Sequence, residues 1–105
     1  MLVVNVIVTV EKNIYGKLKE KAEEEGVSVG AVIREILLNY FELEDETKAY
    51  AKREVSNETI KVGEKEYVRI QVRLSKENEV FIKNELKQRK MTINQLLKNE
   101  ILLTT

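Results

Sequence analysis

Three side chains with several hydrogen-bonding groups alternate along the segment VRIQVRL, and they are well suited to recognise another molecule. They are Arg69, Gln71 and Arg73. A guanidinium group offers five N–H donors in a planar fork, and a glutamine amide both donates and accepts hydrogen bonds. Alternate side chains of a β-strand point to the same side, so these three would share one face. The same pattern also fits a strand that merely faces water, because such a face is normally polar.

The composition excludes most catalytic chemistry. The chain has no cysteine and no histidine, which removes disulfides, zinc fingers and histidine-based catalysis. It has no glycine-rich phosphate loop, and the acidic stretches at 23–25 and 42–46 are better explained as solvated helix surface than as a magnesium site. We therefore expect no catalytic residue, no metal, no cofactor and no small-molecule ligand, and the sequence does not predict an enzyme.

Length and charge indicate a small globular protein with an uneven charge distribution. The 105 residues suffice for one small core. The net charge of zero argues mildly against nucleic-acid binding, but residues 67–105 carry eight basic and four acidic side chains. The apolar start MLVVNVIVTV lacks a charged leader and is shorter than the roughly 20 residues that span a bilayer. We expect a cytoplasmic protein that does not contact a membrane.

The sequence contains two copies of one unit, offset by 64 positions. VNVIVTV at 4–10 aligns without a gap with VRIQVRL at 68–74, and VSVGAVIREILL at 27–38 aligns with MTINQLLKNEIL at 91–102. Apolar positions mostly meet apolar ones, which favours duplication over chance. We divide the chain into three parts, namely a first unit at 1–41, a linker at 42–66 and a second unit at 67–105.

Each unit is predicted to form a strand followed by two helices. The segments 4–10 and 68–74 alternate β-branched or other apolar residues with more polar ones, as half-buried strands do. The following segment of the first unit has apolar residues at every fourth position, as an amphipathic helix does: Ile14, Leu18 and Ala22. Gly26 is expected to end this helix, while Lys90 holds the same place in the second unit.

The linker has no counterpart in the repeat. FELEDETKAYAKRE at 41–54 is compatible with a prolongation of the preceding helix. TIKVGEKEY at 59–67 predicts a short strand or a hairpin that turns at Gly63 and Glu64.

A unit with one strand and two amphipathic helices cannot bury its apolar faces alone. Two units can do so together if their strands pair antiparallel and their four helices close a shared core. The predicted fold is therefore mainly α with a two-stranded antiparallel ribbon, in which the fused units form a pseudo-dimer. The strands could pair within one chain or between two chains.

This order of elements resembles the ribbon-helix-helix (MetJ/Arc-type) family of DNA-binding proteins. VSVGAVIREILLNYF is similar to the second helix of that family, with a serine at the turn and Arg-Glu between two apolar pairs. VRIQVRLS is similar to its strand. The resemblance covers both units and leaves out the linker. A tandem arrangement resembles regulators from viruses of hyperthermophilic archaea, for which the cytoplasm would be that of the host cell.

The resemblance implies that the ribbon enters the major groove of double-stranded DNA and reads base edges with its outer side chains. Arginine can pair with guanine, glutamine and asparagine with adenine, and methyl groups can touch the thymine methyl. Ile7 could instead be covered by another part of the protein. By position, the implied base-reading residues are Asn5, Ile7, Thr9, Arg69, Gln71 and Arg73.

The resemblance also implies phosphate contacts at the start of each second helix, where unpaired N–H groups attract anions. The residues there are Ser28, Val29 and Gly30 in the first unit, and Thr92, Ile93 and Asn94 in the second. Lys12 and Lys76 follow the strands and could reach phosphates or remain solvated. Ser28 and Thr92 would be explained by ordinary helix capping as well.

The sequence therefore predicts a DNA-binding transcriptional regulator. The two strands differ at every reading position, which favours an asymmetric target with a guanine-containing half under Arg69 and Arg73 and an A/T-rich half under Asn5 and Thr9. The few basic contacts favour salt-sensitive binding and homo-oligomers, either dimers or side-by-side assemblies on DNA. The alternative is a protein-interaction or oligomerisation module, antitoxin-like or scaffold, without specific DNA reading.

Overall fold

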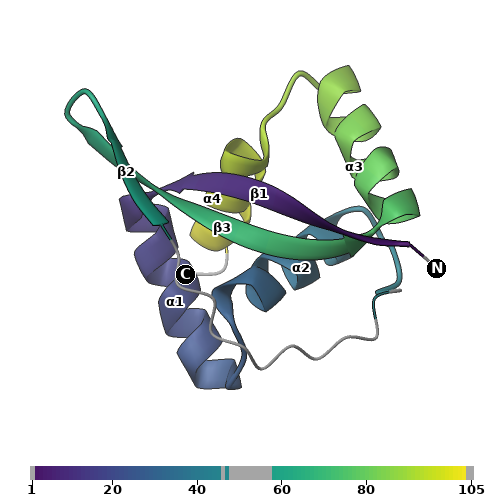
Figure 1. Cartoon of the computed structure of the whole chain (residues 1–105), viewed down its shortest axis with the longest axis horizontal. Helices are drawn as coiled ribbons and strands as arrows, with labels where there is room; N and C mark the ends of the chain where they lie inside the picture. Colours follow the sequence, from purple (N-terminus) through teal and green to yellow (C-terminus); the bar gives the residue numbers. More distant parts are fainter. Residues whose placement is uncertain (1, 46, 48–57, 104–105) are drawn as a thin grey trace.

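The computed structural model describes residues 2–45, 47 and 58–103. The strand-helix-helix order occurs twice, with one further strand between the two copies. The elements are β1 (Val3–Glu11), α1 (Lys12–Glu25), α2 (Val29–Tyr40), β2 (Glu58–Val62), β3 (Lys65–Ser75), α3 (Lys76–Gln88) and α4 (Ile93–Leu103) (Figure 1). None of the described helices is long and apolar enough to cross a membrane.

The sheet has three antiparallel strands in the order β1-β3-β2, all from one chain. β1 pairs with β3 along its whole length, from Val3 opposite Ser75 to Glu11 opposite Tyr67. The described fold is therefore mixed α and β, and the expectation of a sheet with only two strands was wrong. The reason is that β3 begins at Lys65, where it forms a hairpin with β2 through a turn in which Gly63 has a φ of 65°.

The third strand accompanies only part of β3. β2 pairs from Glu58 opposite Arg69 to Val62 opposite Lys65. The remainder of β3 has β1 as its described neighbour, so among the described residues the sheet is two strands wide from Ile70 to Ser75. The β2–β3 hairpin projects beyond the helices at one end of the molecule (Figure 1).

The segment after α2 turns away instead of prolonging the helix. α2 ends at Tyr40, and Glu42 adopts a left-handed φ of 56°. The amide of Leu43 donates to the carbonyl of Leu38 at 2.8 Å, and that of Glu42 donates to Asn39 at 3.2 Å, the pair of bonds that closes a Schellman turn. The expected prolongation was therefore wrong for 42–45; residues 46 and 48–54 of the same expectation lie outside the described part of the chain.

Side chains at the helix starts satisfy amides that have no partner within the helix. Ser28 Oγ accepts from the amide of Ala31 at 3.1 Å, and Ser75 Oγ accepts from Asn78 at 3.2 Å. Thr92 and Gln95 form a reciprocal pair, because each side chain accepts from the backbone amide of the other, at 3.1 and 2.9 Å. The capping box they form fixes where α4 begins.

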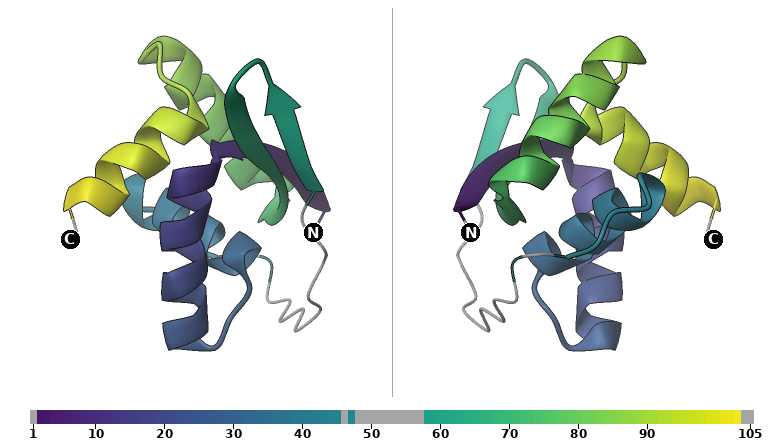
Figure 2. Two further views of the ribbon diagram at one scale, coloured as in Figure 1. Left: turned by 90° about the vertical axis from the view of Figure 1, so that its left-hand side faces the viewer. Right: turned by 90° about the vertical axis from the view of Figure 1, so that its right-hand side faces the viewer.

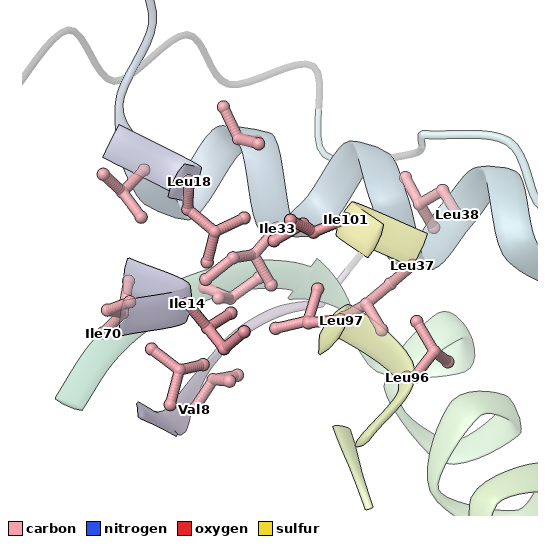
Figure 3. Packing of buried hydrophobic residues seen from close by; sticks show 14 of the residues in the cluster. Val8, Ile14, Leu18, Ile33, Leu37, Leu38, Ile70, Leu96, Leu97 and Ile101 are labelled. Atoms are coloured by element: carbon pink, nitrogen blue, oxygen red, sulfur yellow. The ribbon is translucent and has the colours of Figure 1, made fainter. Parts of the chain in front are cut away.

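The core lies between the sheet and the helices, which all lie on one side of the sheet (Figures 1 and 2). The strands contribute alternate side chains that point inward, such as Val8 and Ile70, both almost fully buried. Helices of both units meet them in one cluster (Figure 3) that includes Leu18, Ile33 and Leu97. Burial of such a side chain contributes about 1.5–3 kcal/mol, so the two units stabilise each other. None of the described helices lies on the opposite face of the sheet.

Candidate nucleic-acid interface

Six side chains expected to read DNA lie together on the helix-free face of β1 and β3. Antiparallel pairing places Asn5 opposite Arg73, Ile7 opposite Gln71 and Thr9 opposite Arg69. Arg73 is half-buried and the other five are exposed. Ile7 keeps 45% of its surface exposed, so within the described residues no segment covers it completely. The outer face therefore combines arginine, amide, hydroxyl and methyl groups in three neighbouring rows.

The strand register changes how these side chains divide into halves. Arg69 and Arg73 lie on one strand, four residues apart, which is about 13 Å at ~3.3 Å per residue. Each lies opposite a residue of the first unit, so the two arginines occupy opposite ends of the face. The expected target had one half under Arg69 and Arg73 and the other under Asn5 and Thr9. This grouping of side chains was wrong, because antiparallel pairing puts one arginine at each end of the face.

Ile7 and Gln71 mark the centre of the β1–β3 ribbon. They are paired in the ladder, and the repeat offset of 64 also makes them equivalent positions of the two units. Rows on either side of this pair differ in composition. One holds Thr9 with Arg69, and the other holds Arg73 with Asn5. The face is therefore symmetric in its backbone pairing and asymmetric in its side chains.

The start of α2 rests directly against the ribbon. A β-carbon at Gly30 would lie 2.5 Å from the backbone oxygen of Gln71, so glycine permits this approach. The neighbouring Val29 is buried, and Ser28 is half-buried with its hydroxyl engaged in the cap. Sequence reasoning assigned Gly30 to phosphate contact and missed its packing role.

The start of α4 is placed differently. Asn94 corresponds to Gly30 in the repeat, yet its side chain meets Glu11 rather than the central pair. Its Oδ1 accepts from the Glu11 amide at 3.2 Å, and its Nδ2 donates to Glu11 Oε1 at 3.5 Å. Glu11 lies four residues beyond Ile7, about 13 Å along the strand. Thr92 is exposed and Ile93 half-buried, and the starts of α2 and α4 are therefore not equivalent.

Both lysines expected near phosphates form ion pairs. Lys12 Nζ lies 2.7 Å from Glu66 Oε2, and Lys76 Nζ lies 2.9 Å from Glu79 Oε1. Both side chains of the Lys12–Glu66 pair are exposed, at 65% and 40%, and such pairs contribute little energy, so Lys12 could exchange its carboxylate for a phosphate at low cost. Lys76 is 51% exposed but its partner Glu79 only 11%, so the same exchange would cost more at Lys76.

Arg34 supports the ribbon from behind and was seen in the sequence only as part of a family motif. It is 15% exposed, and its Nη1 donates to the carbonyl oxygen of Arg73 at 3.5 Å. Its Nε lies 3.1 Å from Asp45 Oδ2. Partial burial raises the pKa of the Asp45 carboxyl, but hydrogen bonds from Thr47 and the charge of Arg34 outweigh it and hold the pKa below its usual value. An arginine inside an apolar helix pattern was the signal available.

The described residues contain no group of three acidic side chains placed to hold a metal ion. The arrangement offers hydrogen-bond donors, acceptors and methyl groups on one strand face, which suits recognition of a grooved polar surface.

Comparisons with known proteins assign the family. A model of the ribbon-helix-helix proteins of the copG family matches residues 4–44. The chain is 63% identical over 98 residues to uncharacterized protein 28 of Sulfolobus islandicus filamentous virus (isolate Iceland/Hveragerdi). This match covers 93% of this chain and 97% of that protein. It is 41% identical over 98 residues to protein ORF100b of Acidianus filamentous virus 2 (isolate Italy/Pozzuoli), covering 93% and 98%.

Among solved structures, the chain is similar to AvtR, described as a novel transcriptional regulator from a hyperthermophilic archaeal lipothrixvirus. The TM-score is 0.82 at 48% sequence identity, and the match covers 93% of this chain and 99% of that one. The family resemblance inferred from the strand and helix motifs is thereby confirmed, and the chain belongs to the ribbon-helix-helix family.

Proposed function

We propose that this protein is a transcriptional regulator that binds double-stranded DNA and reads the major groove with the outer face of β1 and β3. The observation that carries the proposal is the placement of Arg69, Gln71 and Arg73 on a helix-free strand face, opposite Thr9, Ile7 and Asn5. Family membership and the description of AvtR as a transcriptional regulator support it. They also support a binding protein rather than an enzyme.

The dimensions of the sheet suit a groove. The major groove is about 12 Å wide and admits a two-stranded ribbon. β2 pairs with β3 as far as Arg69, so in the part of the chain that the structure describes the rows of Gln71 and Arg73 are two strands wide. In this proposal the units 1–41 and 67–105 act as a fused pseudo-dimer, with both ribbon strands supplied by one chain.

The target sequence would be asymmetric. The repeat offset makes Arg69 equivalent to Asn5 and Arg73 equivalent to Thr9. Each half of the site would therefore contain one guanine contact, but at non-equivalent positions, so a palindrome would not satisfy both halves. The central pair, Ile7 and Gln71, would face a thymine methyl and an adenine edge.

Phosphate contacts would fix the register of the ribbon on the duplex. We assign them to the starts of α2 (Ser28, Val29, Gly30) and α4 (Thr92, Ile93, Asn94), with Lys12 and Lys76 beside them. Affinity that depends on few phosphate contacts should be modest and should fall with salt, and several copies could then bind side by side.

The test is selection of binding sites from randomised duplex DNA. The wild type would be compared with the R69A/Q71A/R73A variant and with K17A/K19A, a control that also removes two positive charges but lies on α1. We expect an enriched, non-palindromic sequence for the wild type and the control, and its loss in the triple variant with the fold retained. Absence of enrichment and of salt-dependent DNA retention in the wild type would instead favour the protein-interaction module.

A further inference from the structure

Acidic side chains gather at the end of the ribbon where Thr9 and Arg69 lie. An open hollow lies between the start of α1 and the β2–β3 turn. Three carboxylates and two lysines line it together with one amide: Glu11, Glu64, Glu66, Lys12, Lys65 and Asn13. Lys12 pairs with Glu66 at 2.7 Å. Glu11 and Glu64 then face Lys65 alone, so the lining carries more negative than positive charge.

The opposite end of the ribbon lacks this carboxylate. The repeat offset makes Ser75 equivalent to Glu11. Ser75 is 1% exposed, and its neutral hydroxyl caps α3 by accepting from the Asn78 amide. The residue that ends each strand and begins the following helix is therefore a neutral serine in one unit and a half-buried glutamate in the other.

Glu11 is also fixed in place. Asn94 binds it through two hydrogen bonds, one to the backbone amide at 3.2 Å and one to Oε1 at 3.5 Å. The first bond fixes the backbone that carries the side chain, and the second restrains the carboxylate itself, so Glu11 is less free to turn away from an approaching duplex than an unrestrained surface side chain. Its negative charge therefore stays beside the Thr9 row.

We infer that Glu11 opposes the DNA backbone at this end and weakens the phosphate contacts proposed for Lys12 and the start of α4, so that the protein holds phosphates mainly at the end where Arg73 and Asn5 lie. The inference rests on the proposed DNA binding. Glu11 follows Thr9 by two residues, about 7 Å along the strand, which is within the Debye length of about 10 Å at 0.1 M salt. Repulsion of phosphates there lowers affinity and shifts the footprint away from the central Ile7–Gln71 row.

The competing explanation is that Glu11 only fastens α4 to β1. Glu11→Gln separates the two, because a glutamine keeps the size and the acceptor for Asn94 while losing the charge. The matched control is Glu24→Gln, which removes the same charge from an exposed position near the far end of α1. Circular dichroism and the midpoint of urea unfolding would check that both variants keep the fold.

The experiment titrates a labelled duplex that carries the selected sequence, at several salt concentrations from 0.05 to 0.3 M (roughly the range over which phosphate contacts are resolved). We expect Glu11→Gln to bind about three- to ten-fold more tightly than the wild type at the low-salt end, with the gain shrinking as salt rises, and Glu24→Gln to bind almost as the wild type does. Phosphate-ethylation interference on the wild type should be stronger on the Arg73 side of the centre.

Equal affinities of the wild type and Glu11→Gln, or a symmetric interference pattern, would overturn this inference. The proposed function would survive that result, provided that the wild type still selects a sequence and the R69A/Q71A/R73A variant does not. If the wild type selected no sequence, the proposed function would fail, and this inference would fail with it.

Discussion

Gly30 lies so close to β3 that a β-carbon at this position would be 2.5 Å from the carbonyl oxygen of Gln71. Contacts this short do not persist in folded proteins, so any larger residue must push the start of α2 away from the ribbon. Gln71 belongs to the central row of the outer face, opposite Ile7. The contact therefore links the β3 backbone at the central row to the start of α2, just after the Ser28 cap.

Gly30→Ala should lower the free energy of unfolding by about 1–3 kcal/mol, as overpacking of a rigid contact does. The atom that must move is a backbone oxygen in the middle of a paired strand, so relaxation is difficult. Urea denaturation followed by circular dichroism would measure the change. Gly16→Ala is the control, since nothing lies within 4 Å of that position in α1 and alanine favours a helix interior by about 0.5–1 kcal/mol. Similar effects from both substitutions would contradict the contact.

The repeated turn between the two helices of each unit offers a reciprocal test. Gly26 and Lys90 are equivalent and both adopt left-handed conformations, with φ of 68° and 53°. The same hydrogen bond closes both turns, from Val27 to Ala22 and from Met91 to Leu86, each at 3.0 Å. A left-handed conformation strains the backbone of lysine, which has a β-carbon, whereas glycine adopts it without strain. Lys90→Gly should stabilise the protein by about 0.5–1 kcal/mol, and Gly26→Lys should destabilise it by about 1–2 kcal/mol.

Thermal unfolding would measure both changes, since 1 kcal/mol shifts the midpoint by roughly 4–8 °C in a chain of this size. No atom lies within 4 Å of a β-carbon at Gly26, so a loss there would come from backbone strain and not from a clash. A lower midpoint for Lys90→Gly would refute the strain argument.

The free energy of unfolding should depend on pH through the carboxyl group of Glu79. Its side chain is 11% exposed, with Lys76 Nζ at 2.9 Å and Lys83 Nζ at 3.4 Å. The hydrogen bond from Lys76, helped by Lys83, lowers the pKa of the Glu79 carboxyl below its ordinary 4.5 although burial acts in the other direction. Since the pKa is lower in the folded state, the contribution is fully present above pH 4.5 and disappears as pH falls through the folded value.

Urea unfolding at neutral and acid pH would test this coupling. Glu79→Gln should be less stable than the wild type at pH 7, and the difference should shrink below about pH 4. Glu20→Gln, at an exposed position of α1, should show no comparable narrowing. A constant difference between Glu79→Gln and the wild type across this pH range would show that the ion pairs do not lower the pKa.

The units and their helices could be predicted because each rests on a local pattern. Alternating residues gave the strands, apolar residues at helical spacing gave the helices, and Ser28 and Thr92 gave two helix starts. The left-handed Glu42 could not be foreseen in the same way, because it depends on the burial of Leu43 against the core and on the pairing of Asp45 with Arg34. Both are tertiary contacts that override local helix propensity.

The candidate site shows the same division. Alternation predicts which side chains share the outer face, because that depends on neighbours two residues away. It does not predict the register, which decides that Arg69 lies opposite Thr9 and Arg73 opposite Asn5. The contact of Asn94 with Glu11 spans 83 residues, and no local pattern reports it.

The register also makes the proposed DNA reading testable one residue at a time. Arg69 and Arg73 lie at opposite ends of the face, about 13 Å apart, which corresponds to about three to four base pairs at ~3.4 Å each. Arg69→Ala and Arg73→Ala should each relax the selected sequence at one end only, and at different ends. Each loss of a bidentate guanine contact should cost about 1–3 kcal/mol of discrimination. Gln71→Ala should instead relax the centre of the selected sequence, since Gln71 lies opposite Ile7.

Selection from randomised duplexes with the three variants in parallel would show directly which base pairs each variant relaxes. Relaxation of the same base pair by both arginine variants would mean that the ribbon does not lie along the groove, and the assignment of one guanine contact to each half would be wrong.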